Sequence, residues 1–383
     1  SSIDTLTISD SDFLNYENYS FMKGFRNLKT LDISGLSVTT EKFDDITSSL
    51  DPKTEIIWDV LYRGQKMPCN IESITVSDDL TDEDIRQLSY FKNLKNLEVE
   101  GMLPLKKLYE IVTTIKEGNP DIQLAYSTKL YGVKIDTSTE TVYLNNKKIK
   151  NTDDLKMAIE LFPNITKYEM CDCGLSDETM GKLREEYPKV TFVWMLHLIK
   201  YNVRTDAQVF STLISKWVGQ IDENTFAPLF KYCTELRALD LGHCYFTQIN
   251  DIVNLKKLKV LVLYDNYIKD ISPLAELTDL TYLDINYNYV KDISPLLNLK
   301  KLEVLGMADN PVTDPSLLCD MDFSHLQMLY ICSVKMSEDT SKKIQKKLPD
   351  GCTYCHVNSA GDVWFGGAQT RVLRANIFPK WKS

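Results

Sequence analysis

Four evenly spaced leucines mark the beginnings of successive segments in the C-terminal half of the sequence: Leu236, Leu258, Leu280 and Leu302. Each leucine opens a run in which the first, fourth and sixth residues are apolar. Two whole units, residues 258–279 and 280–301, repeat almost letter for letter. A short tandem unit of this kind cannot bury its apolar side alone, so its copies must stack on one another into a solenoid.

Within each unit the pattern predicts a short strand, a turn and a helical segment. Apolar and polar residues alternate over the first six positions, which is the two-residue period of a strand. Asn266, Asn288 and Asn310 occupy the ninth position, where an amide can satisfy backbone groups of the loop and of the next coil. Asp-Ile-Ser-Pro-Leu follows at 270–274 and 292–296, with Pro suited to the first turn of a helix. We therefore expect an α/β leucine-rich-repeat solenoid, a curved horseshoe with a parallel concave sheet and short helices or 3-10 turns on the convex side.

The N-terminal half carries the same template in a stretched form. Candidate strands begin at residues 3, 28, 71, 94, 139 and 165, and a longer unit recurs at roughly 70 residues. A second apolar strand is expected after each helical stretch, in segments 55–64, 122–132 and 190–201. Thr81 and Asp84 match a capping box for one of the helices. We predict irregular compound repeats with inserted β-elements in residues 1–235, regular repeats in 236–348 and a C-terminal cap or tail in 349–383.

The regular units resemble those of bacterial internalin-like leucine-rich-repeat proteins over residues 236–335. The compound units and the Trp-containing tail resemble extracellular leucine-rich-repeat proteins of Gram-positive anaerobes. This resemblance implies a curved scaffold, displayed at the cell surface, that binds other macromolecules. It implies no catalytic residue, because the shared motif is structural throughout.

Charge and cysteine content restrict the partners and the location of the protein. The formal net charge is −10 and no basic stripe offsets it, so phosphate backbones and anionic lipids would be repelled. We expect no nucleic-acid partner and, without a run of about eighteen apolar residues, no transmembrane segment. The opening residues lack the pattern of a signal peptide, and nine scattered cysteines imply no disulfide framework. An extracellular or cell-surface location is predicted, with the cytoplasm as the alternative.

The concave face of the regular repeats is the candidate binding surface. If the fourth and sixth positions of each strand face the core, the third, fifth and seventh face outward. These columns combine apolar side chains and carboxylates with tyrosines, which are rigid anchors enriched at interfaces. The alternative is that β-propensity alone placed Tyr and Val on these strands. We hypothesise a site for a protein or peptide partner made by Asp240, Val262, Tyr264, Asp265, Tyr282, Asp284, Asn286 and Tyr330.

Small hydroxyl side chains line the corresponding columns of the N-terminal half, among them Thr5, Thr7, Thr30, Ser73 and Thr75. Such a polar floor could hydrogen-bond a polysaccharide, although it lacks the aromatic platforms that sugar sites use. Glycan binding is therefore an alternative to protein binding.

One segment carries a motif of known chemistry. Cys352-Thr-Tyr-Cys355-His356 matches C-x-x-C-H, the attachment signature of c-type haem. The same segment also aligns with the strands that follow the upstream helices, and neither a haem pocket nor a second axial ligand is evident. A disulfide between Cys352 and Cys355 is a further interpretation. We expect no cofactor.

No other cluster predicts catalysis or metal binding. Cys173 and Cys244 fall at the ninth position, where the repeat accepts Asn or Cys, and are expected to be buried structural thiols. His243 could approach Asp265 one strand over, but no serine partner is evident. We interpret the basic and apolar segment 368–383 as a cap over the last coil.

The sequence thus predicts a non-enzymatic recognition scaffold that binds a protein or peptide at the bacterial cell surface. Its alternatives are a glycan-binding surface protein, an intracellular adaptor of the same architecture and a c-type haem protein.

Overall fold

A computed structural model describes residues 3–91, 93–118, 120, 122–198, 201–212 and 227–356. The chain divides into two compact units, Ser1–Tyr168 and Glu169–Ser383. The segment 357–383, which includes most of the expected C-terminal cap, lies outside the described residues. Among the residues that are described, no helix combines the length and the apolar character needed to cross a membrane.

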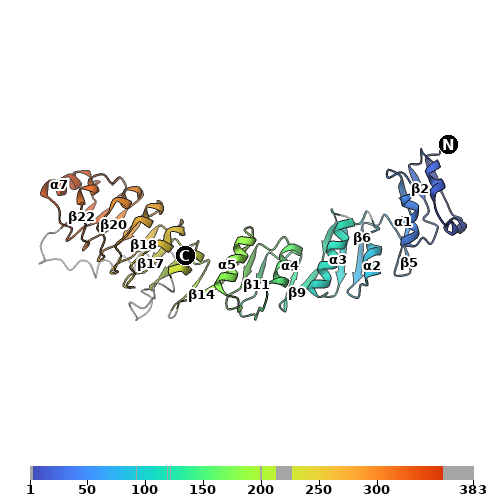
Figure 1. Cartoon of the computed structure of the whole chain (residues 1–383), viewed down its shortest axis with the longest axis horizontal. Helices are drawn as coiled ribbons and strands as arrows, with labels where there is room; N and C mark the ends of the chain where they lie inside the picture. The colour runs from blue at the N-terminus through green and yellow to red at the C-terminus, as the bar shows by residue number, and fades with distance from the viewer. Residues whose placement is uncertain are drawn as a thin grey trace. The chain divides into compact units, whose positions relative to one another are not determined.

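The first unit alternates short strands with helices (Figure 1). Its elements in chain order are β1 (Thr5–Thr7), η1 (Ser11–Asn15), η2 (Ser20–Gly24), β2 (Thr30–Asp32), α1 (Thr40–Ser48), β3 (Glu55–Ile57), β4 (Asp59–Tyr62), β5 (Gln65–Pro68), β6 (Ser73–Ser77), α2 (Asp82–Leu88), β7 (Asn96–Glu100), α3 (Leu105–Gly118), β8 (Gln123–Ala125), β9 (Ser127–Leu130), β10 (Val133–Asp136), β11 (Thr141–Tyr143), α4 (Asp153–Leu161) and β12 (Lys167–Glu169), which lies at the division.

Two kinds of sheet recur in the first unit. Parallel three-stranded sheets have the orders β1-β2-β3 and β6-β7-β8, and antiparallel hairpins are made by β4 with β5 and by β9 with β10. The central strand residues Leu31 and Leu97 are buried. Thr81 and Asp84 form the predicted capping box at the start of α2. Each predicted N-terminal strand is present, and each begins just after its leading apolar position.

The second apolar strands differ from the sequence prediction, because each expected single strand is two. In the first unit the runs bend at Trp58 and Tyr126, both buried, and continue into the hairpins. The backbone closes each hairpin at that aromatic residue: Cys69 N donates to Trp58 O (2.9 Å) and Thr137 N donates to Tyr126 O (3.2 Å). A large ring therefore fills the corner at which the chain leaves the parallel sheet.

The compound unit repeats with a constant spacing along the chain. Strands β3, β8 and β13 begin at residues 55, 123 and 191, and hairpin strands β4, β9 and β14 begin at 59, 127 and 195. The buried aromatic residues at the bends, Trp58, Tyr126 and Trp194, are separated by equal distances in the sequence. The inserted β-elements are thus one hairpin per repeat.

The second unit begins with α5, passes through the last hairpin and continues into a regular array (Figure 1). Its elements are α5 (Asp177–Glu186), β13 (Thr191–Val193), β14 (Met195–Leu198), β15 (Tyr201–Arg204), β16 (Val209–Ser211), η4 (Ala227–Tyr232), β17 (Ala238–Asp240), η5 (Asn250–Asn254), β18 (Val260–Val262), η6 (Ser272–Glu276), β19 (Tyr282–Asp284), η7 (Ser294–Asn298), β20 (Val304–Gly306), η8 (Pro315–Cys319), β21 (Met328–Tyr330), α7 (Glu338–Lys347) and β22 (Thr353–Cys355).

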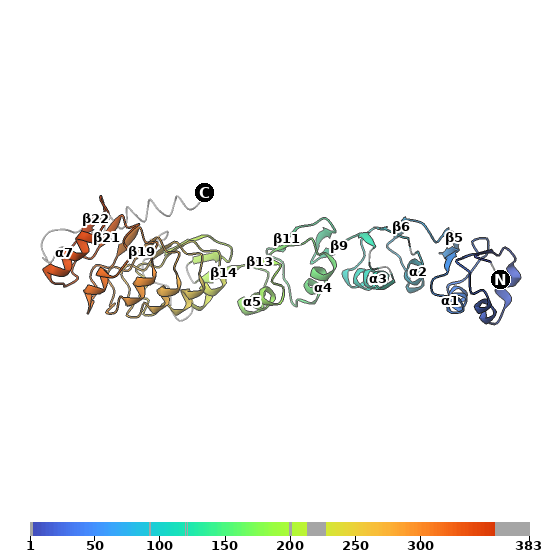
Figure 2. The ribbon, with the colours of Figure 1, turned by 90° about the horizontal axis from the view of Figure 1, so that it is seen from above.

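A parallel sheet of order β16 to β22 forms the spine of the array. Leu239, Leu261, Leu283 and Leu305 are paired in register at its centre and are fully buried. Figure 2 shows the helical segments along one side of these strands. The proline motifs form η6 and η7, each with Pro in the first turn. The predicted leucine-rich-repeat solenoid, with its parallel sheet and 3-10 turns, is confirmed.

The ninth-position asparagines hold neighbouring coils together. Asn288 Nδ2 donates to Leu263 O (2.9 Å) and Ile285 O (3.1 Å), while its Oδ1 accepts from Ile268 N (3.0 Å). Asn266 and Asn310 repeat this arrangement. The predicted hydrogen bonds of each amide to its own loop are confirmed. The sequence also predicted bonds to the next coil, and this was wrong, because each amide binds the turn of the preceding coil. A buried amide that satisfies several backbone groups makes every turn depend on its neighbour.

Candidate functional site

The predicted concave residues lie on strands β17 to β21 or in the turns that follow them. Two of them, Val262 and Tyr282, form a buried cluster with Ala238 and Val260, while Tyr264 packs against it from the side. This cluster is separate from the leucine column, because successive strand residues point to opposite faces of a sheet. Both faces of the sheet in the array therefore contain buried apolar side chains.

The predicted polar residues on these strands are engaged in the sheet itself. Asp240 accepts from Ser211 Oγ (2.9 Å) and from Gly242 N (3.0 Å). Asp284 Oδ1 accepts from the backbone N (3.1 Å) and Nδ2 (2.7 Å) of Asn286. All three of the predicted residues are buried. These contacts give them a structural role, and their contact with a partner stays a prediction.

Glycine at position 306 is explained by the same network. Asn286 Oδ1 accepts from Ala308 N at 2.6 Å, which brings the amide over β20. A Cβ atom at Gly306 would lie 2.6 Å from Asn286 Nδ2. Only glycine leaves space for this amide next to the strand.

Of the remaining predicted residues, Tyr264 and Asp265 lie in the turn after β18, and Tyr330 is the last residue of β21. Asp265 is exposed and its Oδ2 lies 2.6 Å from His243 Nδ1, so the predicted approach of these two residues is confirmed. The His243 ring also contacts Tyr264 edge-on, with centroids 5.0 Å apart. Tyr330 is half-buried, and burial raises the pKa of its hydroxyl. The structure therefore brings Tyr264 and Asp265 together and places Tyr330 three strands further along the sheet.

The turns themselves are built identically from coil to coil. The eighth residue of each unit has a positive φ, between 53° and 66°, at His243, Asp265, Tyr287, Asp309 and Ser333. Its N–H donates to the seventh residue of the next coil, as from His243 N to Tyr264 O (2.9 Å) and from Asp265 N to Asn286 O (3.0 Å). The left-handed conformation is costly for residues with a side chain, and this backbone ladder offsets the cost. Side chains on these turns therefore project from a rigid edge.

A row of exposed tyrosines stands on this edge, and sequence reasoning missed it. Tyr245, Tyr267 and Tyr289 are 56%, 46% and 50% exposed. The first two rings stack with centroids 5.7 Å apart and 16° between planes, and the next pair lies 5.9 Å apart. All three occupy the tenth position of their units, so the regular recurrence of Tyr was the available signal. We call these three residues the tyrosine row.

Further side chains lie beside the tyrosine row. Tyr287 is exposed, its ring lies 5.2 Å from that of Tyr264, and burial and Asp309 raise the pKa of its hydroxyl. Backbone bonds anchor the row, from Tyr267 N to Phe246 O (2.7 Å) and from Tyr289 N to Ile268 O (2.9 Å). Aromatic rings and carboxylates thus share one continuous edge of the array.

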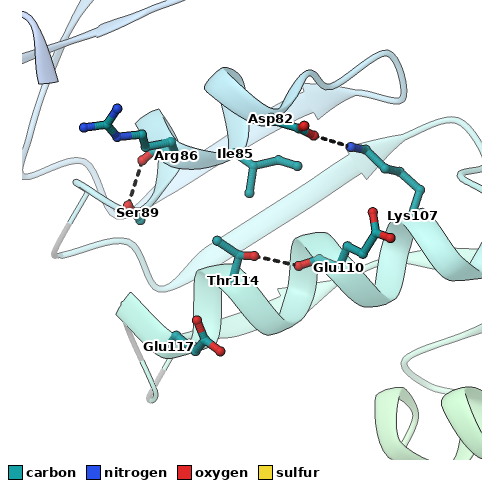
Figure 3. A pocket seen from close by; sticks show the side chains of 8 residues that line it. All are labelled: Asp82, Ile85, Arg86, Ser89, Lys107, Glu110, Thr114 and Glu117. Atoms are coloured by element: carbon teal, nitrogen blue, oxygen red, sulfur yellow. Dashed lines mark hydrogen bonds and ion pairs between the residues drawn. The ribbon is translucent and has the colours of Figure 1, made fainter. Parts of the chain in front are cut away.

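A groove of about 520 Å³ lies between α2 and α3 of the first unit. Figure 3 shows Asp82 of α2 directed at Lys107 of α3, whose Nζ lies 2.8 Å away. Thr114 Oγ1 donates to Glu110 O (2.9 Å) and Ser89 Oγ donates to Arg86 O (2.7 Å). These polar groups pair locally, so the groove does not define a catalytic site.

A second hollow, of about 560 Å³, lies between the start of α5 and β14. His197 Nε2 lies 2.7 Å from Asp172 Oδ1, and Nδ1 lies 3.0 Å from Asn202 Oδ1. The hydrogen bond to Asp172 raises the pKa of His197. Its described partners are a carboxylate and an amide, so it does not form a nucleophile–base pair.

The two cysteines at the ninth position of their units, Cys173 and Cys244, are buried, as the sequence predicted. Burial raises the pKa of the Cys173 thiol, which makes it a poor nucleophile and ligand. In the part of the chain that the structure describes, no three His, Cys, Asp or Glu side chains are arranged to hold a metal ion. Near the C-terminal end, Cys355 of the haem-like motif contacts Cys332.

Comparisons with known proteins agree with this fold. A family model for leucine rich repeats in two copies matches residues 256–298, and no curated protein matches the sequence. Similar solved structures include internalin C2 of Listeria monocytogenes, with 19% identity over 72% of this chain and 77% of that one and a TM-score of 0.29.

Two further solved structures are similar to this chain. Internalin InlF of Listeria monocytogenes has 16% identity over 89% of this chain and 83% of that one, with a TM-score of 0.29. A leucine-rich-repeat protein of Leptospira interrogans has 15% identity over 90% and 98%, with a TM-score of 0.29. Internalins are thus among the similar structures, as the sequence resemblance predicted, but TM-scores this low carry no functional argument. The chain therefore contains leucine-rich repeats over residues 256–298, and solenoids of such repeats commonly serve in protein binding.

Proposed function

We propose that this chain is a non-enzymatic recognition scaffold that binds a protein or peptide partner through the regular array. The contact surface consists of the tyrosine row together with the predicted concave residues that reach its edge, Tyr264 and Asp265. The observation that carries this proposal is the repeated exposure of Tyr245, Tyr267 and Tyr289 on turns joined by backbone hydrogen bonds.

The chemistry of the tyrosine row suits a protein partner. Clustered exposed aromatic side chains on a soluble chain mark interaction sites more often than isolated ones do. Tyrosine offers a large contact area with little side-chain entropy to lose, and its hydroxyl accepts or donates a hydrogen bond. Because the turns are already rigid, a partner would not need to order them on binding.

The charge beside the row indicates which partner segments would bind. Asp265 and Asp309 lie on the same turns, and the whole chain has a formal net charge of −10. A partner segment carrying Arg or Lys would gain electrostatic attraction and cation–π contact with the rings. The proposal includes display at the surface of a bacterium, which rests on the sequence resemblance.

The test is a binding screen of the purified chain against arrayed proteins, peptides and polysaccharides. A variant with Tyr245→Ala, Tyr267→Ala and Tyr289→Ala should lose about tenfold to hundredfold in affinity for a protein hit, as loss of interface anchors does. A matched control carries Tyr16→Ala and Tyr143→Ala, two tyrosines that are 53% and 59% exposed in the first unit, and should bind normally.

A second variant with Tyr264→Ala, Asp284→Ala and Tyr330→Ala separates the turn edge from the concave strands. If only the first variant loses affinity for the partner, the tyrosine row is the binding surface. If both variants lose affinity, the surface includes the concave strands as well. Protein binding that both variants retain would contradict the proposal. Hits confined to polysaccharides would establish the glycan-binding alternative. Protease treatment of intact expressing cells tests surface display.

A further inference from the structure

Two cysteines from the last two described coils of the array lie in direct contact. Strands β21 and β22 are parallel, with Tyr330 paired to Cys355, and Cys332 lies just beyond Tyr330 in the same coil. The Sγ atoms of Cys332 and Cys355 are 2.7 Å apart. Sulfur atoms of separate thiols do not pack this closely, and a covalent S–S bond of about 2.05 Å requires only a small further approach.

We propose that Cys332 and Cys355 form a disulfide that ties the last described strand, β22, to β21. Both side chains are half-buried. Cys355 is the last residue of β22 and Cys332 lies in the turn after β21, and the backbone bond from Ile331 N to Cys355 O (3.0 Å) already joins the two coils. The bond would therefore form without moving either strand.

The position of the pair indicates which part of the fold the bond would stabilise. In the part of the chain that the structure describes, β22 is the edge strand of the sheet β16 to β22. The cysteines are 23 positions apart, and the segment between them contains α7. Closing this loop restricts the unfolded chain, so the disulfide would hold α7 and β22 on the array.

Cys352 is the competing partner for Cys355. These two residues are an odd number of positions apart, so along a strand their side chains point to opposite faces. The Cys352 thiol contacts Thr353 O at 3.9 Å, whereas the Cys355 thiol contacts Cys332. The geometry thus favours Cys332, rather than Cys352 of the C-x-x-C-H motif, as the partner of Cys355.

The oxidation balances with a low-molecular-weight disulfide such as oxidised glutathione. The thiolate of one cysteine attacks the glutathione disulfide, forms a mixed disulfide and releases one reduced glutathione. The second thiolate attacks the protein sulfur and expels the other glutathione. Two protein thiols thereby lose two protons and two electrons, and one glutathione disulfide becomes two thiols.

The environment of the pair makes the reaction depend on pH. Burial and the contact with Cys332 raise the pKa of the Cys355 thiol to about 12. A thiol with so high a pKa contains little thiolate at neutral pH. We therefore expect the overall reaction to accelerate as pH rises.

The test uses the full chain incubated in native buffer with oxidised glutathione, then denatured and alkylated. The reduced protein should react at all nine cysteines, and the oxidised protein should show two fewer free thiols. Peptide mapping by mass spectrometry should find one cross-linked pair that contains Cys332 and Cys355. In Cys332→Ser the number of free thiols should be the same with and without oxidised glutathione. Cys352→Ser is the matched control, and oxidation should still remove two of its free thiols.

Three outcomes would overturn the proposal. The thiol count could stay the same with and without oxidised glutathione. The cross-link could join Cys352 to Cys355, with loss of the bond in Cys352→Ser and its retention in Cys332→Ser. Both cysteines could instead end as separate mixed disulfides with glutathione, which mass spectrometry would show as two added glutathione masses.

Discussion

The compound repeats of the first unit and the regular array of the second share one strand template but differ in the length of each step. The shortest step, from β17 at Ala238 to β18 at Val260, contains the five-residue η5. The step from β2 at Thr30 to β3 at Glu55 is longer and contains the nine-residue α1. The step from β7 to β8 is longer still, from residue 96 to 123, and contains the 14-residue α3. In these three steps the helix is longer where the step is longer, whereas α5 (ten residues) lies in a shorter step than α4 (nine residues).

Strand spacing explains this relation. Neighbouring strands must stay about 4.8 Å apart whatever lies between them, so additional residues cannot widen the sheet. They lengthen the segment on the opposite side, where a helix absorbs them at about 1.5 Å per residue. The step from β21 at Met328 to β22 at Thr353 matches that from β2 to β3, contains the ten-residue α7 and follows the same rule.

The two regions also differ in what happens at the end of a strand. The array continues into the next coil through its buried asparagines and its ladder of positive-φ turns. In the first unit every third strand leads into a hairpin, and each parallel sheet stops at three strands. The outward side chains differ accordingly, since Thr75 is exposed whereas Val260 and Val262 are buried.

The largest expected effect concerns the bend of the compound repeat. Trp58 is buried, stacks on Phe43 with centroids 3.9 Å apart and meets the edge of Tyr90. Trp58→Ala should lower the free energy of unfolding of the first unit by about 4 kcal/mol, because it leaves a large cavity. Urea unfolding followed by circular dichroism measures this change. The exposed Tyr143→Ala is the control and should change it by less than about 0.5 kcal/mol; equal losses would show that the bend is not a packing centre.

The next effect concerns the buried amides of the array. Asn288→Ala removes the partner of at least three backbone groups and should destabilise the second unit by about 3 kcal/mol. Asn96 lies exposed on β7, so Asn96→Ala should leave the first unit nearly unchanged. The same unfolding experiment compares the two variants. Similar losses of unfolding free energy in the two variants would mean that the buried amides are not a special source of stability in the array.

A smaller effect is expected at the hairpin turns. Tyr131 and Gly132 both have a positive φ, 48° and 82°, as a two-residue turn of type I′ requires. A Cβ atom on Gly132 would meet open space, so Gly132→Ala should cost only the backbone strain, about 1 kcal/mol. Gly24→Ala, also in open space but without a positive φ, is the control in the same denaturation series. A loss well above this value would indicate contacts in the hairpin beyond the turn.

The smallest effect concerns the half-exposed pair of Asp172 and His197, of which His197 lies on the last hairpin. The hydrogen bond to Asp172 raises the pKa of His197 above its usual value of 6.5. The pair therefore contributes stability that is fully present below the unfolded pKa and is lost as pH rises through the folded pKa. Histidine titration by NMR should show a lower pKa for His197 in Asp172→Asn. Asn202→Ala should lower it less, and the reverse order would contradict the assignment.

Sequence reasoning recovered most of the fold because the repeat is local. The alternation around Leu261 and Leu283, the proline in the first turn of η6 and the Thr81–Asp84 box each depend on neighbouring residues, and the structure confirms them. The split of the second apolar strand was missed because a run such as 55–64 is largely apolar. Periodicity alone does not reveal where such a run leaves one sheet for another.

The candidate site was predicted less well than the fold. Val262 and Tyr282 occupy the alternate strand positions that the pattern marks, but their burial depends on packing that no local pattern contains, and the role of the site residues stays a prediction. The tyrosine row was visible in the sequence as a regular recurrence, yet its exposure follows from the positive-φ turn that precedes it.

The sequence by itself determined the repeat, the strand positions, the turns and the leucine column, because each is set by the chemistry of a few adjacent residues. Only the tertiary structure decided which coil each asparagine binds, which residues of the concave face are buried and which thiol Cys355 meets. These are contacts between residues 20 or more positions apart, and stacking of the coils, rather than any single unit, brings them together.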